Sequence, residues 1–418
     1  MAEPISVESM PIRRNTLLLA ASMGVLSATL QLVAAVASLT FVLVSGVTGL
    51  LGLGPAIFLA SSGVSAQVAG RMMDRFGRRP VIAAGFLVGA GGAAVTGLGA
   101  RAVSTVVVIC GFVLIGAGAG AVTLVRTAGG DMYPPERRAR GIAYVLSGAV
   151  FGAVLGPAVF GPIFAGRHPA PAEMTVPWLA AGGLMLVGLA LVLAVRPDPL
   201  QIAKLMAPAE PDGGPPAPAA PLRELIGRPG VLAALLAAVA SFAVMASVMN
   251  LTGFVVVDHH HHDQQDVFPI IGAHVLGMYA LVLVVGSLVD RIGRPPALVG
   301  GLVVMGVSCA LLFTVDSVPG TAVLLFGLGV GWNLSFVAAS AELVDRTRPV
   351  ERGKLLGFSE SLSAGSAAAL ALLGGVALDQ LGVSALAFGS AFLVVVPVVL
   401  IGRIRRRPAL ARVADAEA

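Results

Sequence analysis

Runs of about 20 apolar residues recur along this 418-residue chain, and a helix of that length crosses the hydrocarbon core of a bilayer. The chain is 57% hydrophobic and only 12% charged, with a mean hydropathy of +0.93. A soluble protein of this composition would have to expose an apolar surface to water. Because lipid offers no partners to backbone polar groups, we predict an all-α, multi-pass membrane protein.

Twelve of the apolar runs are predicted to be transmembrane helices. Their approximate spans are residues 16–38, 46–69, 80–99, 104–128, 141–164, 176–195, 230–255, 267–289, 297–315, 319–343, 355–377 and 383–402. Cys110 and Cys309 each fall inside a span, where we expect both to be buried and neither to form a disulfide.

The basic residues alternate between the two sides of the predicted membrane. With the N-terminus in the cytoplasm, only Arg101 and Arg167 of the 27 Lys and Arg residues lie on the outer side. Lys and Arg are retained in cytoplasmic loops, so both termini are predicted to be cytoplasmic.

One long polar segment divides the chain into two sets of six spans. It is rich in Pro, Gly and Ala between Arg196 and Gly230, a composition typical of a flexible linker. We therefore expect an N-terminal six-helix bundle at 1–195, a cytoplasmic linker at 196–229, a second six-helix bundle at 230–402 and a cytoplasmic tail at 403–418.

A short motif occurs once in each half, after the second and the eighth predicted helix. It is GRMMDRFGRR at 70–79 and GSLVDRIGR at 286–294. Glycines allow a tight turn with positive φ between two helices. The acidic residue can cap a neighbouring helix or pair with Arg.

The two copies resemble the signature loop of the major facilitator superfamily, as does the segment Asp131–Arg138 after the fourth helix. The resemblance covers nearly the whole chain. It implies two six-helix bundles around a central cavity and alternating access by rocking of the halves. It also implies that Asp74 and Arg75, with Asp290 and Arg291, latch the cytoplasmic side in one state. The alternative is that these charges only fix the topology.

The fifth predicted helix contains Gly148, Gly152, Gly156-Pro157 and Gly161-Pro162. Small residues four apart let helix backbones approach closely, and Pro favours a kink. The pattern resembles a motif of proton-coupled drug exporters in the superfamily. Ordinary close packing is the alternative interpretation.

Residues 245–278 contain three groups of potential metal ligands. They are Met245-x-x-x-Met249, the run His259, His260, His261 and His262, and His274-x-x-x-Met278. Spacing of i, i+4 places each intramembrane pair on one helix face. Counted from the outer helix ends, Met249 and His274 lie about 10 Å deep, and Met245 and Met278 about 15 Å deep. Thioethers and imidazole suit a soft cation, above all Cu(I).

The histidine run is predicted to lie in the outer loop between the seventh and eighth helices. There it would collect cations at the mouth of a metal path, or it would be a solvated polar loop without a function. For the intramembrane pairs, the alternatives are a neutral histidine bonded to another helix and methionines that only pack.

The intramembrane pairs Met245/Met249 and His274/Met278 resemble the metal motifs of the CcoA-like transporters, bacterial importers of copper in the same superfamily. The histidine run is not part of that resemblance. The resemblance implies location in the bacterial inner (cytoplasmic) membrane. Some related proteins are associated with riboflavin uptake, so an organic cargo stays open.

Three functions are therefore considered. The first is a secondary transporter that imports Cu(I) by alternating access, with copper as cargo and no resident cofactor. The second is a transporter of an organic solute, by riboflavin-like nutrient uptake or drug efflux. The third is a metal receptor that does not transport. Catalytic and nucleic-acid-binding motifs are lacking, so neither an enzyme nor a nucleic-acid partner is expected.

The expected partners are the lipid bilayer and the cargo, and the protein is expected to be a monomer.

Arg126, near the inner end of the fourth predicted helix, is interpreted as a boundary group, whereas Glu360 in the eleventh either faces the cavity or is an interfacial group near the inner end. No acidic residue is predicted at mid-membrane depth, so the sequence does not indicate what drives transport.

Overall fold

The computed structural model describes residues 11–133, 138–165, 170–206, 220–346 and 349–382, with 389, 392–399 and 401 beyond them. These residues form helices and no strands. The first half contains α1 (Ile12–Ser45), α2 (Leu53–Phe76), α3 (Arg78–Arg101), α4 (Thr105–Thr123), α5 (Val125–Asp131), α6 (Arg138–Phe164), α7 (Thr175–Leu193) and α8 (Pro199–Met206). The second half contains α9 (Leu222–Gly227), α10 (Val231–Phe254), α11 (Val267–Tyr279), α12 (Val282–Ile292), α13 (Arg294–Leu311), α14 (Val318–Asp345) and α15 (Pro349–Leu381).

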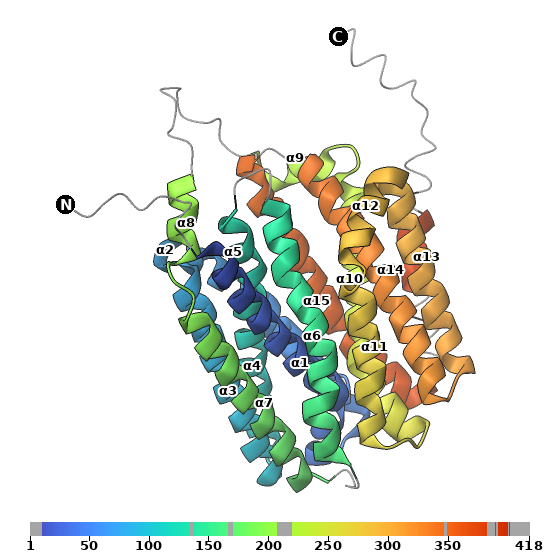
Figure 1. Cartoon of the computed structure of the whole chain (residues 1–418). Helices are drawn as coiled ribbons and strands as arrows, with labels where there is room; N and C mark the ends of the chain where they lie inside the picture. The colour runs from blue at the N-terminus through green and yellow to red at the C-terminus, as the bar shows by residue number, and fades with distance from the viewer. Residues whose placement is uncertain are drawn as a thin grey trace, which may run out of the picture.

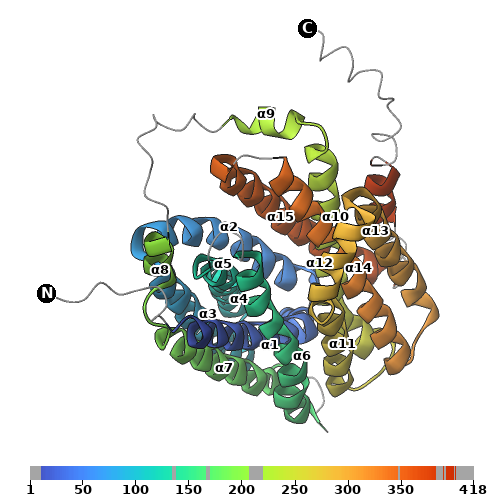
Figure 2. The ribbon, with the colours of Figure 1, turned by 45° about the horizontal axis from the view of Figure 1, so that its top comes forward.

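The helices of the two halves lie beside one another, the first half in blue to green and the second in yellow to red (Figure 1). Helices α8 and α9 lie at one end of the bundle, which we name the linker end. The opposite end carries the π-helical turn η5 (Val255–His259), and we name it the histidine end. Between the halves, α6 and α1 pack against α11, and α2 packs against α15 (Figure 2).

The predicted fold class is confirmed. Ten helical segments in the described part of the chain are long and apolar enough to cross a membrane. The predicted span 267–289 is not one helix, because α11 ends at Tyr279 and α12 begins at Val282. The predicted span 383–402 lies largely outside the described residues. Cys110 is exposed and not buried as expected, while Cys309 is buried. The exposed side of a membrane helix meets lipid, so an apolar run does not by itself indicate burial.

The glycines of α6 bring its backbone against α1, as their spacing predicts. A side chain at Gly148 would overlap the main chain of Ala20, and one at Gly152 would overlap Ser27. Gly156 leaves room for Gln31, whose amide nitrogen donates to the carbonyl oxygen of Gly152. The helix continues through both of its prolines. Close contact between backbones therefore holds these two helices together.

Main-chain contact also closes the histidine end between the two halves. A Cβ atom at Gly253 of α10 would overlap the carbonyl oxygen of Ala35 in α1. At the same end, Gly52 before α2 lies equally close to Ala371 of α15. An apolar cluster seals the same end; it consists of Leu51, Leu251, Phe254, Val255 and Leu378.

Farther toward the linker end, side chains join the halves. Gln67 of α2 donates a hydrogen bond to the hydroxyl of Ser361 in α15. Arg126 of α5 and Glu360 of α15 form an ion pair with an N–O distance of 3.3 Å. Both are contacts between side chains that can separate without moving a backbone. The structure is therefore closed at the histidine end and more lightly joined toward the linker end.

We expect Gly253→Ala to destabilise this closed arrangement. Replacing Gly by Ala inside a helix normally stabilises it by up to about 1 kcal/mol. At Gly253 the methyl group overlaps Ala35, and overpacking of that kind costs about 1–3 kcal/mol. The variant should melt at a lower temperature in detergent than the wild-type protein.

The matched control is Gly183→Ala in α7, where no atom lies within 4 Å of the new methyl group. That variant should melt at the wild-type temperature or above it. Equal melting temperatures for Gly253→Ala and the wild-type protein would contradict the tight crossing of α1 and α10.

Candidate functional site

His274 is a fully buried imidazole in the middle of α11. Its Nδ1 lies 2.7 Å from the carbonyl oxygen of Leu325 in α14. A carbonyl oxygen only accepts, so the hydrogen of the neutral ring sits on Nδ1 and the lone pair on Nε2. Nε2 is buried and has no hydrogen-bond partner among the described residues. A metal-binding histidine has this arrangement, with one ring nitrogen held by a carbonyl and the other available.

Met278 is buried one helical turn beyond His274. Gly329 of α14 fits against the main chain of both residues, because a side chain at this position would overlap the carbonyl oxygen of His274. Close packing of α11 on α14 therefore fixes the depth and direction of this pair. The neighbouring crossing at Gly277, against Phe326, has the same effect.

The second pair lies on α10, with Met245 buried and Met249 half-buried. Helix α10 packs mainly against α15, α14 and α1, whereas α11 packs mainly against α14 and α6. The two pairs are thus carried by helices that share α14 as a neighbour. Their convergence on one ion stays a prediction.

The histidine run is divided between η5 and the loop that follows it. The His259 ring packs on Phe254, with centroids 6.0 Å apart. His262 Nε2 donates to the main-chain oxygen of Asp316 at 2.7 Å. His260 Nε2 lies 3.7 Å from the Asp316 carboxylate. Burial lowers the pKa of His260, which favours its neutral form, although the Asp316 charge opposes the shift.

In the part of the chain that the structure describes, no three His, Cys, Asp or Glu residues are grouped to hold a metal ion. The histidine run instead contacts the loop before α14 in this conformation. Its role as a cation collector stays a prediction.

The repeated motif makes the same turn in both halves. Gly77 has a φ of 99° and Gly293 a φ of 84°, and each precedes the first residue of the next helix, α3 or α13. Only glycine adopts this conformation readily. The expected glycine turn is confirmed in both copies.

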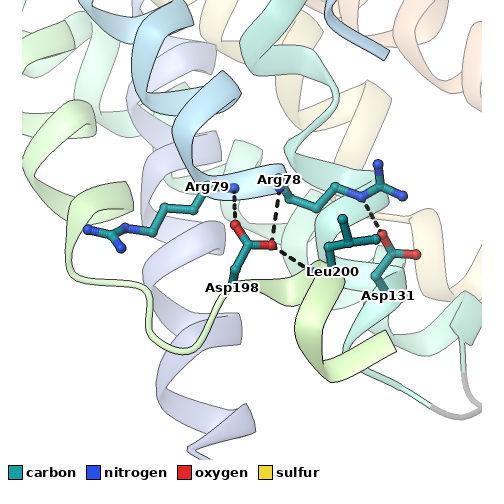
Figure 3. A network of polar contacts seen from close by, with 5 residues as sticks. All are labelled: Arg78, Arg79, Asp131, Asp198 and Leu200. Atoms are coloured by element: carbon teal, nitrogen blue, oxygen red, sulfur yellow. Dashed lines mark hydrogen bonds and ion pairs between the residues drawn. The ribbon is translucent and has the colours of Figure 1, made fainter. Parts of the chain in front are cut away.

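A carboxylate outside the motif caps the first of these turns (Figure 3). Asp198 accepts hydrogen bonds from the backbone nitrogens of Arg78 at 3.1 Å, Arg79 at 2.9 Å and Leu200 at 2.8 Å. The Arg78 side chain pairs with Asp131 at 2.7 Å. One carboxylate therefore caps the N-termini of α3 and α8 together and ties the motif to the end of the sixth span.

Asp198 was not among the predicted site residues, although a local pattern indicates it. It directly precedes Pro199, and Asp followed by Pro is typical of the N-cap and first residue of a helix.

The structure describes the side chains of only two of the four predicted latch residues. The side chains of Asp74 and Asp290 lie outside the described residues, while Arg75 and Arg291 are exposed. The latch therefore stays a prediction.

Comparison with known families identifies the fold. The family model described as Major Facilitator Superfamily matches residues 14–273 and 258–418, which together span nearly the whole chain. The chain belongs to the major facilitator superfamily. Its membership makes it a multi-pass membrane transporter and not an enzyme.

Curated relatives in the superfamily match most of the chain. An uncharacterised MFS-type transporter of Bacillus subtilis, YdeG, is 32% identical over 370 residues, covering 86% of this chain and 84% of the relative. The riboflavin transporter RfnT of Brucella anthropi is 28% identical over 397 residues, covering 93% of this chain and 96% of the relative.

Solved structures of the superfamily share the fold at low identity. The xylose transporter XylE from E. coli, in a partially occluded inward-open conformation, superposes with a TM-score of 0.71 and 14% identity. That match covers 95% of this chain and 98% of the transporter. A POT family transporter gives a TM-score of 0.74 with 12% identity over 94% of this chain and 98% of that protein.

Removal of the Asp198 carboxylate should loosen the linker end of this superfamily member. Loss of an N-cap costs about 0.5–2 kcal/mol, and Asp198 caps two helices at once. We expect Asp198→Ala to lower the melting temperature in detergent, and Asp198→Asn, which keeps one acceptor oxygen, to lower it less.

Arg79→Ala is the control, because it keeps the backbone N–H that Asp198 accepts. It should melt no lower than the wild-type protein. A wild-type melting temperature for Asp198→Ala would show that the cap contributes nothing.

Proposed function

We propose that this transporter imports Cu(I) across the bacterial cytoplasmic membrane by alternating access. The observation that carries the proposal is the state of His274. Its Nδ1 is held by the Leu325 carbonyl, and its Nε2 is buried without a partner. A buried polar atom without a partner is costly, so a ligand that satisfies it is favoured. A cation bound at Nε2 would meet that need.

The neighbouring side chains favour a soft, singly charged ion. Met245 and Met278 are buried thioethers, and Met249 is half-buried. Together with one imidazole they supply soft, uncharged ligands, which suit Cu(I). Mg²⁺ and Ca²⁺ prefer oxygen ligands, which these four side chains lack.

The proposed route follows the length of α10 and α11. The distribution of basic residues predicts a cytoplasmic linker end, and under this proposal the histidine end faces outward. His259 to His262 would collect the ion there. Met249 and His274 would bind it first, Met245 and Met278 next, and separation of the halves at the linker end would release it inside.

The test is uptake of radiolabelled copper by cells that express conservative variants at the normal level. Met245→Leu and Met278→Leu keep the side-chain volume and remove the sulfur, while His274→Gln keeps a donor for the Leu325 carbonyl. Each should reduce uptake about tenfold or more, because even residues that only support a metal ligand have effects of that size.

The matched control is Met305→Leu, which removes a fully buried thioether from α13. It should leave uptake unchanged. Wild-type uptake by the double variant Met245→Leu/His274→Gln, with the protein present at normal levels, would rule out the copper path.

An organic solute is the second candidate, and the similarity to the riboflavin transporter RfnT favours it. Under this hypothesis the four ligands only pack between helices. A riboflavin auxotroph that expresses the protein should then grow at a low external riboflavin concentration. The Met245→Leu/His274→Gln variant should support the same growth. No growth above the empty-vector control would exclude riboflavin as the cargo.

A further inference from the structure

A row of aromatic rings crosses the second half on the linker side of the four proposed ligands. The Trp332 and Phe336 rings of α14 are stacked, with centroids 5.0 Å apart and planes 16° apart. Trp332 meets the edge of Tyr279 in α11 at 6.0 Å. Phe336 meets Phe242 of α10 at 6.4 Å. We name these four residues the aromatic row.

The row lies at mid-membrane depth and next to the proposed copper path. Trp332 is at the midpoint of the 28-residue helix α14. Tyr279 directly follows Met278 in the chain, and Phe242 lies about one helical turn from Met245. The row therefore connects α10 with α11 through α14.

A charged pair lies beside one end of the row. Arg126 and Glu360 are paired at 3.3 Å across the two halves, and both interact electrostatically with Tyr279. Their side chains are 28% and 42% exposed, and the pair joins α5 of the first half to α15 of the second. This pairing agrees with the alternative in which Glu360 faces the space between the helices, and it gives Arg126 a partner that the sequence did not indicate. Ionisable residues on the helices of a membrane bundle are costly unless paired, and they commonly belong to functional sites.

One donor in the row has no partner. The Trp332 side chain is only 8% exposed, and its Nε1–H finds no acceptor among the described residues. A buried indole N–H usually has a hydrogen-bond partner. A ligand that presents an acceptor to Trp332 would supply the missing bond.

We propose that the aromatic row and the Arg126–Glu360 pair form a binding site for a planar heteroaromatic molecule. Its ring would stack on the aromatic row, with Trp332 Nε1 donating to a ring acceptor. Arg126 would donate to a carbonyl or similar acceptor of the ligand, and Glu360 would accept from an N–H or O–H. Because the pair carries no net charge, the site favours a neutral ligand with both donors and acceptors.

The site rests on the proposed transport function but not on copper as the cargo. It uses none of Met245, Met249, His274 or Met278. It deepens the second candidate function, because it assigns residues and a ligand class to an organic cargo. Ligand sites at the interface of two halves commonly combine aromatic walls with a few polar groups in this way.

The test uses the two tryptophans of the chain, Trp178 and Trp332. Trp178→Phe leaves Trp332 as the single tryptophan, and the purified protein in detergent is titrated with riboflavin as the planar probe. Ribitol, which is polar and not planar, is the control ligand. We expect saturable quenching of Trp332 emission by riboflavin and none by ribitol.

The reverse variant, Trp332→Phe, leaves Trp178, which is fully buried against Phe112 and bonded to Thr40. Its emission should not show saturable quenching. Glu360→Gln should weaken riboflavin binding about tenfold, since hydrogen bonds to charged groups contribute the most. The fluorescence of riboflavin itself gives the same affinities in the wild-type background, in case Trp178→Phe does not fold.

Quenching that does not saturate, equal quenching of Trp178, or unchanged affinity in both Trp332→Phe and Glu360→Gln would overturn the site. Met245→Leu/His274→Gln should keep full riboflavin affinity, and its loss would contradict a site separate from the four ligands. Saturable binding together with unchanged copper uptake in that variant would reject copper while supporting this site.

Discussion

Backbone contact at glycines is the interaction on which the arrangement of this protein depends. In lipid, apolar side chains gain nothing by leaving a solvent, so close van der Waals packing between small residues associates the helices. Gly148 brings α6 against α1, Gly253 brings α10 against α1, and Gly329 brings α14 against α11. The contact at Gly329 determines how the His274 ring is oriented. It places the Leu325 carbonyl within 2.7 Å of His274 Nδ1 and so leaves Nε2 as the free ring nitrogen.

The same helix, α14, carries two different kinds of binding group. Toward the histidine end, its carbonyl at Leu325 orients an imidazole on α11. At its midpoint, Trp332 and Phe336 present stacked rings, and Trp332 also meets the ring of Tyr279 in α11. The first group suits a soft cation and the second a planar organic molecule. Met278 and Tyr279 are consecutive in sequence, so a cargo that moves along α11 passes from one to the other.

Much of the fold could be predicted, because apolar run length and the period of the glycines reflect constraints that act locally. The turns at Gly77 and Gly293 are of this kind, since positive φ is a property of one residue. The spacing of Gly148 and Gly152 also indicated that α6 packs closely against another helix, which is α1. The break between Tyr279 and Val282 was not, because an uninterrupted apolar run is compatible with one helix or two.

The site was predicted only in part, for a related reason. His274 stands out because imidazole is rare in such a run. Its hydrogen-bond partner is a backbone carbonyl. Because every residue has a backbone carbonyl, the sequence does not indicate which one the imidazole meets. The sequence marked Arg126 as a boundary group and left Glu360 either facing the cavity or at the interface, because each is near a helix end in sequence. Their pairing across the halves depends on how α5 and α15 face one another. Trp332 is one aromatic residue in an apolar helix, so the sequence did not indicate which other rings pack against it.

X-ray absorption at the copper edge, on purified protein loaded with one equivalent of Cu(I), tests the central claim most directly. It reports the elements bound to the ion, independently of uptake or folding in cells. We predict sulfur and nitrogen neighbours in the wild-type protein, and loss of the sulfur signal in Met245→Leu/Met249→Leu/Met278→Leu. Coordination by nitrogen and oxygen alone, or no retained copper, would contradict the assignment of these methionines and His274 to a Cu(I) path.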